Sequence, residues 1–406
     1  MVNIAVLGYG TVGSGVVEVL RTNQKAIDKR AGKEINLKYV LDLRDFPGDP
    51  VQEILVHDYD TILNDDSVQI VVEVMGGVNP AYKFVKEALL RGKSVCTSNK
   101  ELVAKYGAEL LEIAKSKNIN FLFEASVGGG IPIIRPLNQS LTADEIMEIS
   151  GILNGTTNFI LTKMSKDGLD FDTVLKEAQE LGYAERNPEA DVEGYDACRK
   201  IAILSSLACG KQVDFEDIYT EGITKITDID FKYASELGVS IKLIGTSKRV
   251  DGGFCAMVAP KMISDEHPLA GVNGVMNAIF VKGNVLGDVM FYGAGAGKLP
   301  TASAVVSDVV DAVKHMGTNI MTIWNTSKIE LVDIDNVTAR FFIRFSGEVD
   351  SERLAQVEKA FGKGEVITLP EVSGEFGFVT SDMTEGEYKK AAAGVDGIIT
   401  MIRYEK

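Results

Sequence analysis

A densely charged stretch in the middle of the chain, AERNPEADVEGYDACRK (residues 184–200), holds residues suited to acid–base chemistry. Asp196 and Lys200 are four residues apart, so they lie on one face if the stretch is helical. Reduction of a carbonyl by hydride needs a proton donor for the developing alkoxide, and an ammonium held by a carboxylate can serve. Spacing alone, however, favours an exposed ion pair that contributes less than about 1 kcal/mol. Asp191 is of the type that caps a helix, and surface charge is expected for Arg186, Glu189 and Glu193.

A glycine-rich turn, GYGTVG at residues 8–13, follows the short apolar segment VNIAVL. In such a turn Gly8 permits the sharp bend, Gly10 lets a pyrophosphate approach the backbone, and Gly13 lets helix and strand pack closely. The phosphates would then meet the unpaired N–H groups of the helix. The pattern is weak by itself, but after the first strand of an alternating series it predicts a dinucleotide site.

The segment VLDLRDF, at the end of the second predicted strand, bears on the choice of cofactor. An acidic residue there, such as Asp42, holds the ribose hydroxyls of NAD, whereas an arginine such as Arg44 binds the 2′-phosphate of NADP. Asp42 comes later after Gly8 than the usual spacing of about 20 residues. The choice stays open, with a slight preference for NADP.

Two further positions could contact ligands. Lys100, in SVCTSNKELVA, follows the carboxyl end of a predicted strand, where ligands bind in open α/β sheets; a solvated loop lysine is the alternative. Glu124 is followed by VGGGIP, where backbone carbonyls could face a small cation. A purely structural glycine bend is the simpler interpretation.

The first part of the chain predicts a parallel, doubly wound sheet, because strands alternate with helices. The expected strands are residues 2–7, 38–41, 70–73, 94–97 and 120–124, and the intervening helices include 80–91 and 104–118.

The rest of the chain predicts an α+β region followed by a ferredoxin-like module. The α+β region has expected helices at 172–181 and 191–209 and strands at 145–153, 253–258 and 278–282. A second glycine cluster, GAGAGK, then precedes an apolar helix. The tail is expected to form strand 338–345, helix 351–361, strands 365–369 and 375–380, helix 385–394 and strand 398–404. This βαββαβ order is typical of a ferredoxin-like fold.

The bulk composition narrows the class of protein. A length of 406 residues predicts two or three domains at about 150 residues each. The formal net charge of −16 argues against nucleic acid or an anionic membrane as the main partner. The four cysteines show no metal or disulfide spacing, the N-terminus enters a strand directly, and no apolar run is long enough to span a membrane. A cytoplasmic protein is expected.

Several motifs together resemble the homoserine dehydrogenase family over essentially the whole chain. They are GYGTVG, TSNKELVA, FEASVGGGIPII, GILNGTTNFIL, LGYAERNPEADVEGYDACRKIAIL and HPLAGVNGVMNAIFVKGNVLGDVMFYGAGAGKLPTASAVVSDVV. The resemblance implies NAD(P)H-dependent interconversion of L-aspartate 4-semialdehyde and L-homoserine, on the route to threonine, methionine and isoleucine. Without a kinase-like region before residue 1, the monofunctional form is expected.

The resemblance also implies residue roles. Lys200 would be the proton donor, Asp196 its partner, and Lys100 a second lysine near nicotinamide and substrate. Glu185 would bind the amino group of the substrate. The other implied substrate contacts are Asp191, Gly155, Thr156, Gly182 and Tyr183. The implied cofactor contacts are Gly8, Gly10, Thr11, Val12, Gly13, Arg44, Thr97, Ser98, Lys100 and Gly297.

The family resemblance further implies a monovalent cation, sodium or potassium, held mainly by main-chain oxygens. The matching positions are Glu124, Val127, Gly129 and Ile131. Dimerisation through the middle domain is implied, so a homodimer or homotetramer is expected. Three domains follow: an NAD(P)-binding Rossmann domain over 1–135, completed by about 298–325; a substrate-binding, catalytic and dimerisation domain over 136–297; and an ACT-like regulatory or assembly domain over 336–406.

Two departures from the family pattern leave questions open. VLDLRDF differs from the more usual VLVRD-like form, so NAD and NADP both remain candidates. In the tail, SGEVDSERLAQ lacks the D-x-P-G-x-L signature of loops that bind an amino-acid effector, so feedback by threonine and a purely assembling role are both retained. Two other functions are weighed: another amino-acid-aldehyde oxidoreductase of the same architecture, and a non-catalytic sensor of NAD(P) or an amino acid. The retained Lys200 argues against the sensor, which needs no proton donor.

Overall fold

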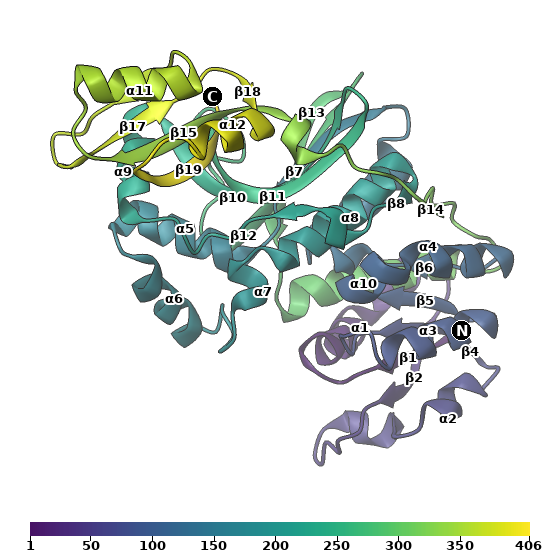
Figure 1. Ribbon diagram of the computed structural model, residues 1–406. Coiled ribbons are helices and arrows are strands. Elements are labelled where there is room, and N and C mark those ends of the chain that lie inside the picture. The colour runs from purple at the N-terminus through teal and green to yellow at the C-terminus, as the bar shows by residue number, and fades with distance from the viewer. The chain divides into compact units, whose positions relative to one another are not determined.

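The structure is a computed structural model that describes residues 1–406 (Figure 1). The chain divides into two compact units, each assembled from three segments. The first unit comprises Met1–Ile146, Ala202–Glu216 and Lys282–Ile329, and the second comprises Met147–Ile201, Asp217–Val281 and Glu330–Lys406. No helix is both long and apolar enough to cross a membrane.

The first unit is built on a six-stranded, all-parallel sheet with the order β3-β2-β1-β4-β5-β6. This is the strand order of a doubly wound dinucleotide-binding fold, so the predicted fold class is confirmed. The strands are β1 (Val2–Leu7), β2 (Ile35–Leu41), β3 (Leu55–Val56), β4 (Val68–Glu73), β5 (Ser94–Thr97) and β6 (Phe121–Leu122). The central strands are rich in β-branched residues because helices bury both faces.

The helices of this unit are α1 (Thr11–Ala31), α2 (Tyr59–Leu63), α3 (Ala81–Leu90), α4 (Lys100–Ser116) and α10 (Lys298–Lys314). Helix α10 comes from late in the sequence and packs against α1 (Figure 1). A Cβ on Gly15 of α1 would lie 2.8 Å from the Lys298 carbonyl oxygen, so only glycine permits this approach. Strand β13 (Gly287–Ala294) and the short parallel pair β8 (Lys211–Gln212) and β14 (Asn325–Lys328) complete the unit.

The second unit contains a sheet whose strands follow the order β12-β7-β10-β11-β19-β15-β17-β16. Its first four strands are β12 (Met276–Gly283), β7 (Ile146–Ile152), β10 (Val239–Val250) and β11 (Gly253–Ser264). The strands β10 and β11 form a long antiparallel hairpin, of which only part of β11 was predicted. Short strands β9 (Tyr219–Thr220) and β18 (Met383–Thr384) pair with β11 and β15.

The C-terminal module has the predicted βαββαβ order, interrupted only by β18. It consists of β15 (Thr338–Ser346), α11 (Ser351–Phe361), β16 (Glu365–Ile367), β17 (Glu375–Val379), α12 (Glu385–Ala392) and β19 (Ile398–Glu405). Buried aromatic side chains, among them Phe341, Phe345 and Phe378, form its core. The module also pairs β19 in parallel with β11, so its sheet continues that of the rest of the unit.

The remaining helices of the second unit are α5 (Gly155–Asp167), α6 (Phe171–Glu180), α7 (Glu189–Val192), α8 (Tyr195–Cys209) and α9 (Asp228–Leu237). The single helix predicted over 191–209 is wrong: Gly194, with φ of 83°, separates α7 from α8. Asp191 therefore lies inside α7 and does not cap the long helix. Helix α5 was not predicted, although Asn154 before it is a strong N-cap residue.

Candidate active site

The glycine turn between β1 and α1 has the geometry of a phosphate-binding loop. Gly8 has φ of 97°, and a Cβ on Gly13 would lie 1.9 Å from the Gly8 carbonyl oxygen, so both positions require glycine. A Cβ on Gly10 would meet nothing within 4 Å. No side chain caps α1, and its first N–H groups and positive dipole end therefore suit a pyrophosphate. Thr11 and Val12 begin this helix, as predicted.

Asp42 and Arg44 form one unit at the end of β2. The Asp42 carboxylate accepts hydrogen bonds from the Tyr9 and Arg44 amides at 2.8 and 3.0 Å, and from Arg44 Nε and Nη2 at 3.0 Å each. These bonds, with the Arg44 guanidinium contributing most, hold the pKa of Asp42 well below its usual range. The Arg44 side chain is 64% exposed and lies over the Phe46 ring. The arginine is the more accessible of the two groups.

The loop after β5 places Lys100 at the first position of α4, beyond the carboxyl end of the strand as predicted. Thr97 is fully buried, and its hydroxyl donates to Glu73 Oε2 at 2.6 Å. Asn99 caps α4 by accepting from the Leu102 amide and donates to the Gly77 carbonyl. The Thr97 side chain thus braces the loop and is not open to a cofactor. Glu73 was not anticipated; burial raises its pKa.

Glu124 follows β6 and turns its carboxylate toward the backbone. It accepts from the amides of Ile133, Ile134 and Arg135 at 2.6, 2.8 and 2.8 Å. Its side chain is thereby engaged in holding a turn, and only main-chain oxygens of this segment remain as cation donors. No group of three or more His, Cys, Asp or Glu side chains is placed to hold a metal ion, which does not bear on a site made of main-chain oxygens.

Lys200 and Asp196 form a buried ion pair in the second unit. Lys200 Nζ donates to Asp196 Oδ2 and to the Leu153 carbonyl oxygen, both at 2.7 Å. The two side chains are only 10% and 5% exposed. The exposed ion pair that spacing favoured is therefore wrong, because α8 turns this face inward against the end of β7 and the start of α5.

Asn154 is the residue at the centre of this cluster, and sequence reasoning did not single it out. Its Nδ2 donates to Asp196 Oδ2 at 2.9 Å and to Asp191 Oδ1 at 2.7 Å, while its Oδ1 accepts from the Thr157 amide and caps α5. One side chain therefore links the ion pair, the short helix α7 and the start of α5. Its position before GTTN was the available signal, since asparagine favours N-caps.

The turn that contains Gly182, Tyr183 and Glu185 is joined to the same helix. Thr156 Oγ1 donates to the Tyr183 carbonyl oxygen at 2.7 Å, and the Tyr183 ring packs edge-on against Phe159. Glu185 is exposed, as are Arg186 and Glu189. The Glu185 side chain is therefore open to solvent, two residues after the Tyr183 carbonyl that Thr156 binds.

The structure thus collects the predicted residues into two sets, one in each unit. The second unit brings together Lys200, Asp196, Asp191, Gly155 and Thr156 around Asn154, with the Tyr183 turn beside them. The first unit holds the glycine turn, the Arg44 loop, Lys100, and Gly297, which precedes α10 as its N-cap with φ of 113° and no side-chain cap. These sets fit a proton-transfer centre and a nucleotide-binding edge respectively.

Comparisons with known proteins agree with this chemistry. A family model described as homoserine dehydrogenase matches residues 132–310, and one described as its NAD-binding domain matches residues 8–124. Homoserine dehydrogenase from Synechocystis is 41% identical, covering 96% of this chain and 95% of that protein. The crystal structure from Thiobacillus denitrificans has a TM-score of 0.91 at 37% identity and covers 100% and 98% of the two chains. A hyperthermophilic archaeal homoserine dehydrogenase in complex with NADPH has a TM-score of 0.66 at 31% identity, covering 77% and 97%.

Proposed function

The chain belongs to the homoserine dehydrogenase family, an NAD(P)-dependent oxidoreductase family acting on a CH–OH group, and on this premise we propose which residues interconvert L-aspartate 4-semialdehyde and L-homoserine. The observation that carries the proposal is the buried Lys200–Asp196 pair. The Lys200 ammonium donates hydrogen bonds to a carboxylate and to a carbonyl oxygen, and these bonds fix its position. Because the group is buried, water screens its charge little.

Lys200 is the proton donor. NAD(P)H, when bound, supplies the hydride that adds to the aldehyde carbon. As charge develops on the carbonyl oxygen, the Lys200 ammonium stabilises it and gives that oxygen one proton, which yields the hydroxyl of homoserine and a neutral amine. In the reverse direction the amine takes the hydroxyl proton. Asp196 and the Leu153 carbonyl orient Nζ, and Asn154 holds Asp196 in place.

The substrate's polar ends are held by the elements around this pair. The exposed Glu185 carboxylate binds the amino group by charge. The start of α5, at Gly155 and Thr156, presents backbone N–H groups to the carboxylate of the substrate. Asp191, Gly182 and Tyr183 shape this edge, because Asn154 and Thr156 tie them to α5. Lys100 provides a second cation near the nicotinamide and the substrate.

NADP is the preferred cofactor in this proposal. Gly8, Gly10, Thr11, Val12, Gly13 and Gly297 bind the pyrophosphate region, and Ser98 and the main chain of Thr97 line the nicotinamide side. The Asp42 carboxylate already accepts four hydrogen bonds and has little capacity left for ribose hydroxyls, whereas Arg44 is exposed. An exposed guanidinium suits a 2′-phosphate.

A monovalent cation, sodium or potassium, binds to main-chain oxygens at Glu124, Val127, Gly129 and Ile131. Glu124 contributes its carbonyl and not its carboxylate, which the amides of residues 133–135 occupy. The cation would stabilise this turn and bring no redox chemistry. Removal of monovalent salt should lower activity, and its restoration should recover it.

The oligomer is a homodimer or homotetramer, and the C-terminal module regulates it or assembles it. A titration of threonine and other amino acids into the assay, with light scattering alongside, separates the two roles. Inhibition by an amino acid at unchanged mass supports regulation, whereas no response to any of them leaves an assembly role.

The deciding experiment is a steady-state assay with homoserine and either NADP or NAD, on the wild type and on Lys200→Ala. The wild type should turn over homoserine with the lower KM for NADP. Lys200→Ala should lose about 10²–10⁴-fold in kcat while it still binds NADPH, because the proton donor is lost and the proposed cofactor contacts belong to the first unit. Replacement of the exposed Lys176 on α6 by alanine is the matched control. A Lys200→Ala variant with wild-type kcat would disprove the donor role.

A further inference from the structure

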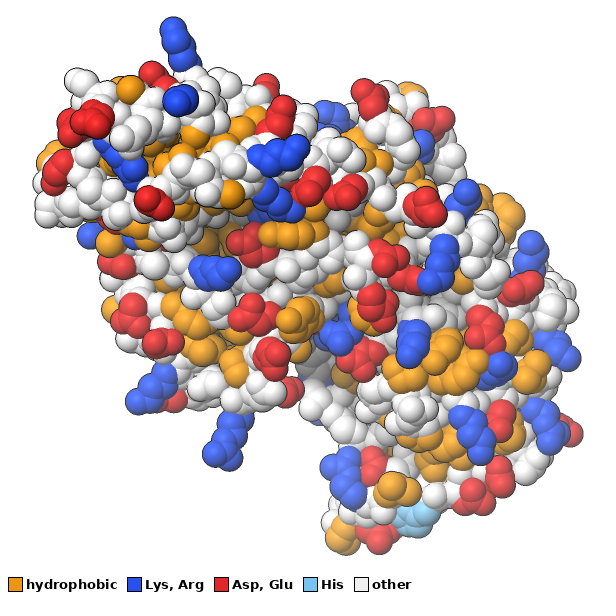
Figure 2. Space-filling view, in the orientation of Figure 1, with side chains coloured by type: hydrophobic (Ala, Val, Ile, Leu, Met, Phe, Trp, Pro, Cys, Tyr) orange, Lys and Arg blue, Asp and Glu red, His pale blue; other side chains and the backbone are white.

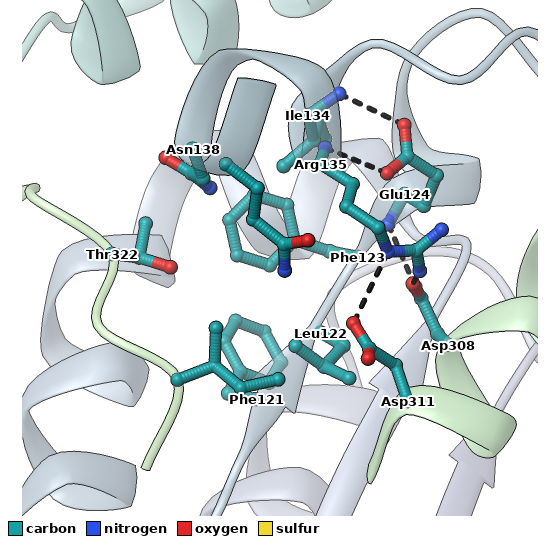
Figure 3. Close-up of a pocket in the computed structure, with 12 residues that line it drawn as sticks. Phe121, Leu122, Phe123, Glu124, Ile134, Arg135, Asn138, Asp308, Asp311 and Thr322 are labelled. Carbon is teal, nitrogen blue, oxygen red and sulfur yellow. Dashed lines mark hydrogen bonds and ion pairs between the residues drawn. The ribbon is translucent and has the colours of Figure 1, made fainter. Parts of the chain in front are cut away.

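A closed network of largely buried polar contacts joins the two ends of the segment 124–135, which follows β6 (Figure 3). The Glu124 carboxylate accepts hydrogen bonds from the amides of residues 133–135. At the other end the Arg135 guanidinium donates to Asp308 Oδ1 at 2.5 Å and to Asp311 Oδ2 at 3.1 Å. Asp308 Oδ2 in turn accepts a hydrogen bond from the Glu124 amide at 2.8 Å. The ring passes through Glu124, Arg135 and Asp308 and closes on itself.

The network places acidic side chains where water is largely excluded, so their charges need a nearby cation. Glu124 and Asp308 are 3% and 2% exposed, and Arg135 is the only cation that contacts both Asp308 and Asp311. Burial, together with the charge of Glu124, raises the pKa of Asp308 well above its usual range. Loss of the guanidinium would leave buried acid groups without compensation, which is far costlier than loss of a surface pair.

Asp308 belongs to α10, so the network ties residues 124–135 to that helix. A second set of contacts ties the same segment to the start of α10. The Gly130 amide donates to the Ala294 carbonyl at 3.0 Å, and a Cβ on Gly129 would lie 2.4 Å from the Gly295 carbonyl oxygen. The glycine turn at 128–130 is thus pressed against the second glycine cluster, which ends at Gly297.

Helix α10 in turn packs on α1 through Gly15 and the Lys298 carbonyl. Both helices begin without a side-chain cap, at Gly10 and Gly297. Two open helix N-termini, each suited to phosphate, are therefore placed relative to each other by the packing of α10 on α1, and α10 is in turn fixed to residues 124–135.

We propose that Arg135 and Asp308 are positioning residues for the cofactor: by fixing residues 124–135 on α10, they set the place of the Gly297 backbone relative to the glycine turn of α1. This rests on the proposed cofactor-binding role of those two turns. Neither residue touches the reacting atoms.

The test measures the Kd for NADPH by isothermal titration, together with the thermal midpoint, for Arg135→Met, Arg135→Lys and Asp308→Asn in the full chain. Each should weaken NADPH binding, Arg135→Met by at least about tenfold, since small displacements of positioned groups have effects of this size or larger. Arg135→Lys keeps the charge but loses the planar fork, and should fall between wild type and Arg135→Met.

Lys93→Met is the matched control, because Lys93 is also a buried cation of this unit. Its Nζ donates to the Asp65 and Val68 carbonyls at 2.6 and 2.9 Å, at the start of β4 and β5 and thus away from their carboxyl ends. Its loss should lower the thermal midpoint and leave the Kd for NADPH unchanged.

An unchanged Kd in Arg135→Lys and Asp308→Asn overturns the proposal, including the case in which Arg135→Met does not fold. So does a rise in Kd that Lys93→Met matches, because that would report general loosening. Since binding is measured without turnover, a wild type that binds NADPH but ignores homoserine would overturn the proposed function and leave this inference to be judged by the Kd values.

Discussion

At the scale of single residues, the decisive property of Lys200 is its burial. Water screens the interaction of an exposed ammonium with other charges. The Lys200 ammonium is buried and binds oxygens of Asp196 and Leu153, both at 2.7 Å, so its interactions are screened much less. Burial of a charge is tolerated only with such partners. Asn154 completes the arrangement because its amide binds the Asp196 oxygen that the ammonium also binds.

Glu185 offers the contrasting case of an exposed carboxylate, for which substrate binding is proposed. We expect Glu185→Gln to raise the KM for L-homoserine by about tenfold with a smaller change in kcat, because it removes a charge that binds substrate and takes no part in proton transfer. Steady-state kinetics with NADP held saturating measures both constants.

Glu189→Gln is its control, because Glu189 is another exposed carboxylate of the same charged stretch. If both variants raise the KM equally, the effect is one of overall charge. If neither does, Glu185 lies outside the substrate site.

At the scale of elements, the start of α1 and the start of α5 are the places proposed to bind cofactor and substrate. Each begins at a glycine-containing turn and is positioned by packing on a strand or loop. For α5 the loop 271–276 does this: Asn158 Nδ2 donates to the carbonyls of Val272, Gly274 and Met276 at 3.0–3.2 Å. Lys242 Nζ adds a bond to the Val272 carbonyl at 2.7 Å.

The glycine turn allows affinity and stability to be separated. A methyl group on Gly10 meets no protein atom, so Gly10→Ala should keep the thermal midpoint and weaken NADPH binding by at least about tenfold, or 1.4 kcal/mol. Gly13→Ala places its Cβ 1.9 Å from the Gly8 carbonyl and should lower the midpoint as well. Differential scanning fluorimetry and titration with NADPH distinguish the two. Equal affinity in Gly10→Ala and wild type would rule out a phosphate at this turn.

Lys242 predicts a pH dependence. Burial, with a smaller contribution from Lys166, lowers its pKa to about 8. Between this value and about 10.4, the ordinary lysine pKa, the unfolded chain holds a proton that the folded chain releases, so Lys242 makes stability rise with pH across that window. The effect should be on the order of 1–2 kcal/mol.

The measurement compares thermal midpoints of wild type and Lys242→Met at pH 7 and pH 10. The wild type should gain relative to the variant at the higher pH, whereas the exposed Lys176→Met should run parallel to wild type. A pH-independent difference between wild type and Lys242→Met would contradict the shifted pKa.

At the scale of the whole molecule, the C-terminal module is built into the sheet of the second unit. Lys261 of β11 stands opposite Arg403 of β19, and Arg403 donates to Glu385 at 2.5 Å and to Glu221 at 2.9 Å. Arg344 of the module likewise binds Asp230 of α9 at 2.6 Å. Such a module cannot swing freely on a linker. Over the face seen in Figure 2, acidic and basic side chains are interspersed without a continuous basic patch.

This attachment predicts a large cost for Arg403→Met. Arg403 and Glu385 have side chains 3% and 1% exposed, so loss of the guanidinium leaves a buried carboxylate unpaired and should reduce the free energy of unfolding by about 3–5 kcal/mol. Denaturant unfolding followed by circular dichroism measures it. Lys389→Met removes the half-exposed pair between Lys389 of the module and Asp335, which precedes the module, and should cost less than about 1 kcal/mol. Similar costs for the two would show that the module is not held by the buried pair.

The sequence alone predicted the fold of the first unit, the order of elements in the C-terminal module and the family. Alternating strands and helices and the GYGTVG turn predicted the parallel sheet and its nucleotide-binding edge, because these depend on local periodicity and on backbone conformations that only glycine adopts. The tail's βαββαβ order was predicted for the same reason, and the motifs pointed to the family.

Only the tertiary structure decided the state of the charged stretch 184–200. An i, i+4 ion pair has the same sequence spacing on an exposed helix face as on a buried one. Whether this pair is buried depends on contacts with Leu153 and Asn154, over 40 residues earlier. The Glu124–Arg135–Asp308 ring was equally invisible, since its members lie up to 184 residues apart. Patterns within a short stretch of sequence cannot predict such contacts, because they contain no information on which distant residues the folded chain brings together.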